Sequence, residues 1–236
     1  MQTIRLLFKV LWSPAESMFL LSKKPRVLVP MLFLCAFSFV AGTVMVMKVD
    51  MAELTIRALE RSPQGATLSD QQKDLMRQQM NSPVLKSFTF VSTAIGPLLI
   101  VFCVTAIYFV LFTIAGREGG FKSFLSITTF AFIPLAVRQA AGVFSVFLIP
   151  PSSLMLDELG SLSPAVFLDR DRLSPVVFAA VNMIDLVTIW ILILLVIGYG
   201  FVARKSLSKG ARAACVIGVF LAYAAFRLAF AAFRGI

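Results

Sequence analysis

The stretch VLVPMLFLCAFSFVAGTVMVM, residues 27–47, decides the fold class of this chain. It contains no charged residue, and it is long enough for an α-helix to cross a bilayer core, which takes roughly 20 residues. Further apolar blocks follow at residues 88–115, 124–149, 175–203 and 211–233. The repetition predicts an all-α, polytopic integral membrane protein with five transmembrane helices.

The composition agrees with a lipid environment and excludes several classes of function. Of the 236 residues, 59% are hydrophobic and 14% are charged, whereas soluble domains are roughly 45–50% apolar. The net charge of +10 comes from basic residues beside the apolar blocks, which favours anionic lipid headgroups over nucleic acid as partners. The chain has no histidine, and its cysteines fall inside apolar blocks. We therefore expect no metal, no cofactor and no enzyme of the Ser-His-Asp or Cys-His type.

Residues 1–26 predict an interfacial amphipathic helix before the first span. Arg5 and Lys9 lie one helical turn apart on one face of an otherwise apolar segment, as in helices that lie on a membrane surface. A signal peptide is the alternative, but the apolar stretch before Pro14 is short and no small-residue cleavage site follows it. We expect this lead-in to be retained ahead of a membrane domain at residues 27–236.

The first loop, at residues 48–87, is long and polar and predicts an extramembrane helical hairpin. Ser69 and Asp70 start a helical run at residues 71–80. The sequence Ser-Pro-Gln-Gly at residues 62–65 breaks the helical pattern before that run, so we expect the hairpin to turn there.

The short loops predict the orientation. Two of them are basic, with Arg117 and Lys122 in one and Arg204, Lys205, Lys209 and Arg212 in the other. Basic short loops face the cytoplasm. The loop at 150–174 is more acidic, with Asp157, Glu158, Asp169 and Asp171 against Arg170 and Arg172. With five spans, this pattern places the N-terminus in the cytoplasm and the C-terminus outside.

Ionisable groups within the spans are the candidate site, because such groups are costly at membrane depth. Arg138 and Asp185 each lie about 15 Å from the outer end of their predicted span, near the midplane, and we expect them to meet as an ion pair. Gln139 and Asn182 are expected to satisfy the remaining donors and acceptors. The pair either fixes the packing of the third and fourth spans or lines a polar pathway.

Small residues recur on the fifth span, at Ala214, Gly218 and Ala222. A small residue at every fourth position lets another helix approach closely. The partner is either another helix of this chain or a second copy of it, and the sequence leaves both open.

Several motifs resemble the Yip1-domain family. They are GREGGFKSFLS at residues 116–126, FIPL at 132–135 and VNMIDLVTIW at 181–190, preceded by SPAESMF at 13–19 and Lys-Pro at 24–25. Their order and spacing cover nearly the whole chain. The short lead-in and the helical loop after the first span are similar to prokaryotic-type members.

The resemblance implies five spans and a cytoplasmic N-terminus. It also implies relatives in eukaryotes that associate with Rab-type small GTPases in vesicle traffic, although this chain lacks their long polar N-terminal domain and their Asp-Leu-Tyr-Gly-Pro motif. The expected function is a non-enzymatic membrane scaffold or trafficking-type factor in a bacterial inner membrane. It would bind lipid, and itself or other membrane proteins. The alternative is a small transporter, channel or lipid-moving protein that uses Arg138 and Asp185.

Overall fold

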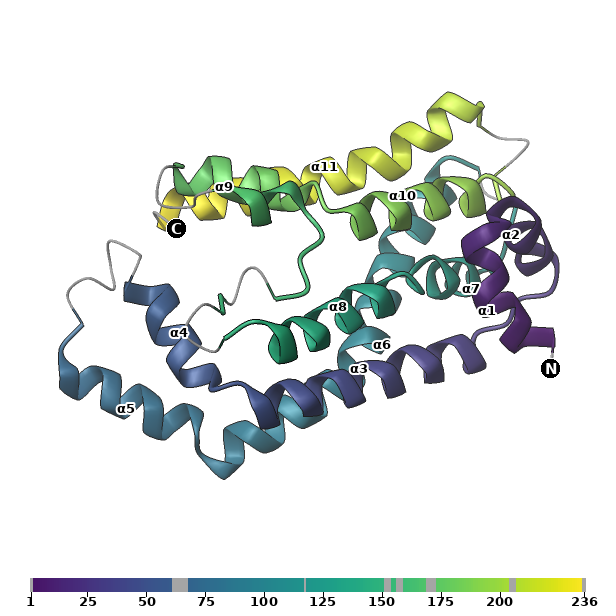
Figure 1. The fold of residues 1–236 in the computed structure, drawn as a ribbon. Coiled ribbons are helices and arrows are strands. Elements are labelled where there is room, and N and C mark those ends of the chain that lie inside the picture. Colours follow the sequence, from purple (N-terminus) through teal and green to yellow (C-terminus); the bar gives the residue numbers. More distant parts are fainter. Residues whose placement is uncertain are drawn as a thin grey trace. The chain divides into compact units, whose positions relative to one another are not determined.

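The computed structural model describes residues 2–60, 68–116, 118–150, 154–155, 159–168, 173–203 and 207–234. Every regular element in these ranges is a helix (Figure 1). The predicted turn at 62–65, Arg117, the charged residues at 157–158 and 169–172, and Arg204 and Lys205 lie outside the described residues.

The helices are interrupted more often than the sequence predicted. Their bounds are α1 Gln2–Trp12, α2 Pro14–Lys23, α3 Leu28–Lys48, α4 Met51–Glu60, α5 Asp70–Met80, α6 Pro83–Ile114, α7 Phe121–Ala131, α8 Leu135–Leu148, the 3₁₀ helix η1 Pro164–Phe167, α9 Pro175–Met183, α10 Leu186–Tyr199 and α11 Lys209–Arg234.

Among the described residues, four helices are long and apolar enough to cross a membrane: α3, α6, the α7–α8 segment Phe121–Leu148, and α11. The bent pair Val176–Met183 and Leu186–Tyr199 makes a fifth if it is counted as one span. The first and fifth predicted spans match α3 and α11 within two residues. The second begins earlier than predicted, at Pro83 instead of residue 88, because proline is well placed in the first turn of a helix.

The third predicted span, at 124–149, is not one continuous α-helix. A turn at residues 132–134 separates α7 from α8. Its hydrogen bonds are the tighter i to i−3 type, with Leu135 N donating to Phe132 O at 2.9 Å and Val137 N donating to Pro134 O at 2.9 Å. Pro134 has no N–H to donate, so the regular ladder is broken there.

The chain forms two compact units, each with its own interior. Unit 1 comprises Met1–Ala36, Ile95–Val137 and Leu186–Tyr223. Unit 2 comprises Phe37–Ala94, Arg138–Asp185 and Ala224–Ile236.

Unit 1 has an apolar and aromatic interior. α2, α7 and α10 pack against one another, with α1 against α2 and α7 (Figure 1). Tyr199 lies at the centre of this interior, fully buried, with its ring 5.1 Å from that of Phe124 and its hydroxyl 2.7 Å from Thr128 Oγ1. Gly198 permits the close approach of α10 to α7, because a Cβ there would lie 2.3 Å from Ile127 Cγ2.

The lead-in is part of unit 1. Leu6, Leu7 and Val10 on α1 are buried in the apolar core of the unit. The chain is also fastened where it leaves α2, since Ser126 Oγ accepts from Arg26 N at 2.9 Å and donates to Arg26 O at 3.0 Å.

Unit 2 contains a helical hairpin, in which α4 and α5 lie side by side (Figure 1). α5 begins at Asp70, one residue before the predicted helical run at 71–80, and Ser69 and Gln72 form a capping box at its start. Glu60 pairs with Lys73 at 2.6 Å, and Glu53 pairs with Arg77 at 3.2 Å. These ion pairs join the two helices of the hairpin.

Candidate functional site

The candidate site in unit 2 begins where the fourth predicted span is interrupted. The sequence predicted one helix over residues 175–203, but α9 ends at Met183 and Ile184 is not helical, with φ −82° and ψ 67°. Asp185 therefore lies between two helices instead of on the face of one. Its carboxylate bonds to a distant backbone N–H, and such polar side chains compete with the helical ladder.

Arg138 and Asp185, which the sequence analysis expected to meet, form an ion pair. Arg138 Nη2 lies 2.6 Å from Asp185 Oδ1, and the Asp185 side chain is 2% exposed while that of Arg138 is 35% exposed. The other carboxylate oxygen, Oδ2, accepts a hydrogen bond from Leu162 N at 2.9 Å. Both oxygens of this buried carboxylate are therefore held by the protein.

Asn182 and Gln139 do not complete the ion pair as predicted. Asn182 Oδ1 accepts from Ser161 Oγ at 2.9 Å and from Ser163 Oγ at 3.0 Å. Gln139 Nε2 donates to Ser38 Oγ on α3 at 2.5 Å. The two amides instead fasten neighbouring segments to α9 and α8, which makes the cluster wider than the sequence predicted.

The loop that supplies these contacts crosses the backbone of α8 at Gly160. Gly160 has φ +70°, and a Cβ there would lie 2.6 Å from Arg138 O and 3.0 Å from Gly142 N. Only glycine adopts this conformation at such close range without strain. The crossing brings Ser161, Leu162 and Ser163 beside Asp185 and Asn182.

Sequence reasoning missed Ser38, Gly160, Ser161 and Ser163, and it interpreted residues 150–174 as a translocated loop. The sequence contains only a weak signal for the contacts made by this loop. Gly160 starts the sequence Gly-Ser-Leu-Ser-Pro, which reads as a surface turn because such residues dominate turns. No local pattern shows that this turn reaches a buried carboxylate.

The chemistry of the cluster is that of a neutral pair with hydroxyl and amide neighbours. Among the described residues, no group of three or more His, Cys, Asp or Glu side chains is placed to hold a metal ion. Within the same part of the chain, Gln139 Oε1 is buried without a hydrogen-bond partner. Gln139 Oε1 is therefore an unsatisfied acceptor within the cluster.

The stripe of small residues on α11 is exposed. Ala214, Gly218 and Ala222 all lie on the open side of the helix, and a Cβ added at Gly218 meets nothing within 4 Å. The stripe is therefore an exposed surface of α11 within unit 1, and a close partner helix for it stays a prediction.

Comparison with known proteins gives one match. The model of the Yip1 domain matches residues 8–230, a range that includes α2 to α10 and the whole polar cluster. No curated protein and no solved structure matches the chain.

Proposed function

Because the chain belongs to the Yip1 domain family, we propose that it is a non-enzymatic membrane scaffold or membrane-organisation factor of the trafficking type. The family and the apolar helices make it an integral membrane protein in contact with the lipid bilayer. We also propose that it is a prokaryotic-type member in a bacterial inner membrane. In this proposal the chain has five spans and a cytoplasmic N-terminus, and its basic loops face anionic headgroups.

The observation that carries the scaffold role is the closed state of the Asp185 carboxylate. The Asp185 side chain is 2% exposed, with one carboxylate oxygen on Arg138 and the other on Leu162 N. A carboxylate that carries ions or protons has to exchange partners, whereas this one fastens a loop and two helices. In this proposal, the ion pair fixes how the loop and the helices pack.

Two features favour a second candidate, a small transporter, channel or lipid-moving protein. The third and fourth apolar blocks, which contain Arg138 and Asp185, are both interrupted near these residues. Broken helices with polar residues at the break are typical of transport sites. In addition, the buried Gln139 Oε1 has no hydrogen-bond partner among the described residues.

The deciding experiment measures flux in liposomes that contain the purified full chain. Proton, ion and phospholipid movement are followed for the wild type, Asp185→Asn and Arg138→Gln, and circular dichroism checks that each protein is folded. A parallel arm applies photo-crosslinking in native membranes, followed by identification of the attached membrane proteins.

A scaffold shows no flux above empty liposomes and a reproducible set of crosslinked membrane proteins. Flux that both substitutions abolish in folded protein would replace the scaffold with the transporter and make the ion pair its site. Absence of both flux and crosslinked partners would remove both proposals.

A further inference from the structure

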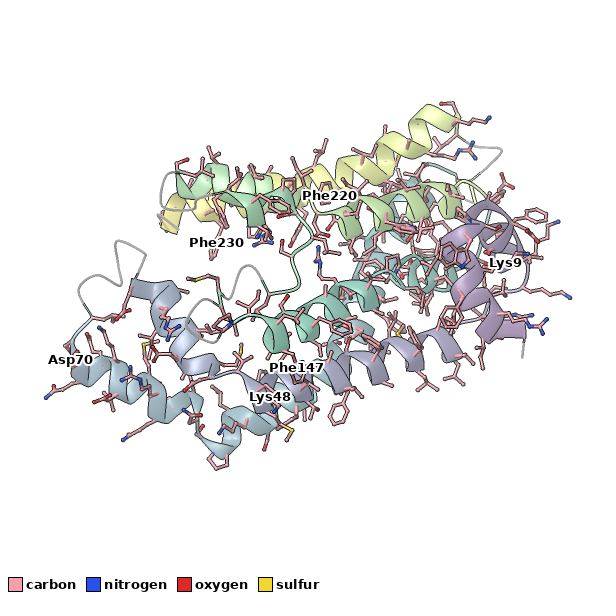
Figure 2. All side chains as sticks on the ribbon, in the orientation of Figure 1. Lys9, Lys48, Asp70, Phe147, Phe220 and Phe230 are labelled. Atoms are coloured by element: carbon pink, nitrogen blue, oxygen red, sulfur yellow. The ribbon has the colours of Figure 1, made fainter. Side chains whose placement is uncertain are left out.

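A cavity of about 540 Å³ lies between α1 and α2 in unit 1, at the surface of the lead-in. Its volume is within the roughly 300–1,000 Å³ of small-molecule sites. Five of its lining side chains are cationic: Arg5, Lys9, Lys23, Lys24 and Arg26. The others are apolar, namely Leu6, Phe19 and Leu20. Figure 2 shows Lys9 among the side chains of this part of unit 1.

Three of the five cationic side chains in this cavity have no carboxylate partner among the described residues. Lys9 pairs with Glu16 at 2.5 Å, and Arg26 donates to Thr3 Oγ1 at 2.9 Å. Among the described residues, no carboxylate lies within 4.0 Å of the charged groups of Arg5, Lys23 or Lys24. Such a cluster around a concave surface is complementary to an anion, and phosphate oxygens are favoured acceptors for Lys and Arg.

The surroundings of the cavity indicate a ligand that is also apolar. On α1, Ile4, Phe8 and Trp12 recur every fourth residue and are 56%, 57% and 79% exposed. Within the cavity itself, Phe19 and Leu20 remain 39% and 44% exposed. A free phosphate would leave these side chains in water, whereas a membrane surface would cover them.

The position of the cavity along the chain agrees with a place at the membrane surface. Arg26 lies two residues before α3, the first apolar span. At the start of that span Leu28 and Leu32 are 72% and 59% exposed, as expected of side chains that contact lipid. The cationic side chains are thus close in sequence to the point where the chain enters the bilayer.

We propose that the cavity between α1 and α2 binds the phosphate headgroup of an anionic phospholipid. The cationic side chains hold the phosphate, and the stripe Ile4, Phe8 and Trp12 lies against the acyl region. This site is independent of whether the chain acts as a scaffold or as a transporter, since it uses neither Arg138 nor Asp185.

The test counts bound lipids by native mass spectrometry of the full chain in neutral detergent, during titration with phosphatidylglycerol or phosphatidylcholine. The test variant is Lys23→Gln with Lys24→Gln. The control is Lys86→Gln with Lys209→Gln, which removes the same charge at exposed positions outside the cavity. A third arm adds millimolar inorganic phosphate as a competitor, and circular dichroism confirms that all proteins are folded.

The expected result is one tightly retained phosphatidylglycerol on the wild type. Each lysine near an anionic lipid surface contributes to the affinity, so the test variant should bind phosphatidylglycerol about thirtyfold more weakly than the wild type. The control variant should bind it within about twofold of the wild type. Equal retention of phosphatidylcholine would overturn the proposal, as would equal losses in both double variants. Displacement by inorganic phosphate would overturn it in favour of a site for a soluble phosphate.

Discussion

The two units of this protein are stabilised by different kinds of contact. In unit 1 the buried core is apolar and aromatic, with Phe112, Phe124 and Tyr199 among its largest fully buried side chains. In unit 2 the buried apolar cluster is small, formed by Val49, Leu54 and Leu154. The same unit contains the Arg138–Asp185 ion pair and its hydrogen bond to Leu162 N.

The difference indicates which unit is more sensitive to single substitutions. Apolar packing is spread over many weak contacts, so the loss of one contact is a small fraction of the total. A buried polar network depends on each member, because the removal of one leaves another unsatisfied in a low-dielectric interior. We therefore expect the removal of one polar side chain to destabilise unit 2 more than unit 1.

The largest effect is expected for Asp185→Ala. It strands Arg138 and frees Leu162 N, and the loss of one partner of a buried pair costs about 3–5 kcal/mol. We expect about 3 kcal/mol, since Arg138 is partly exposed and retains some access to polar surroundings. Thermal unfolding in detergent measures the change. The double variant Arg138→Gln with Asp185→Asn should recover part of the loss, and a double variant that is less stable than Asp185→Ala would contradict the pairing argument.

The next largest effect is expected for Gly160→Ala in unit 2. A left-handed residue other than glycine costs about 1–2 kcal/mol, and the added Cβ would lie 2.6 Å from Arg138 O. Hydrogen exchange should show earlier opening of residues 159–165. Gly218→Ala is the matched control, because a Cβ there meets nothing within 4 Å. Equal protection in the two variants would show that the crossing at Gly160 does not hold this loop.

A smaller effect is expected for Tyr199→Phe in unit 1. The substitution removes the hydrogen bond to Thr128 but keeps the ring contacts with Phe124 and Tyr108. Hydrogen bonds between membrane helices contribute about 0.6 kcal/mol on average. A decrease in melting temperature as large as that caused by Asp185→Ala would show that the two units are equally sensitive to the loss of a polar contact.

The smallest effect is expected from acid on the hairpin formed by α4 and α5. The hydrogen bond from Lys73 holds the pKa of Glu60 below its ordinary value of 4.5. The pairing therefore stabilises the hairpin fully above that value, and its contribution is lost as the pH falls through the lowered pKa. Spin labels on α4 and α5 should report a distance distribution that widens as the pH falls below 4.5. Glu60→Gln should flatten this pH dependence, and an unchanged profile would exclude the pair as its cause.

The predictions from sequence were best where one physical term dominated. The apolar blocks of α3 and α11 were located within two residues, because lipid solvation acts on each residue of a span in the same way. The ion pair was also anticipated, since opposite charges at membrane depth require partners. The hydrogen bonds of Gln139 and Asn182 were wrongly assigned, because their partners come from segments distant in the chain, as Ser38 does for Gln139.

The sequence by itself predicted an all-helical membrane protein that resembles the Yip1 domain family, and a pairing of Arg138 with Asp185. Only the tertiary structure decided that the third and fourth apolar blocks are interrupted, that Gly160 crosses α8, and that five cations of the lead-in surround one cavity. The physical reason is the distance along the chain over which each effect acts. Hydropathy and charge act residue by residue along the chain, whereas backbone crossings and concave surfaces depend on atoms that only folding brings together.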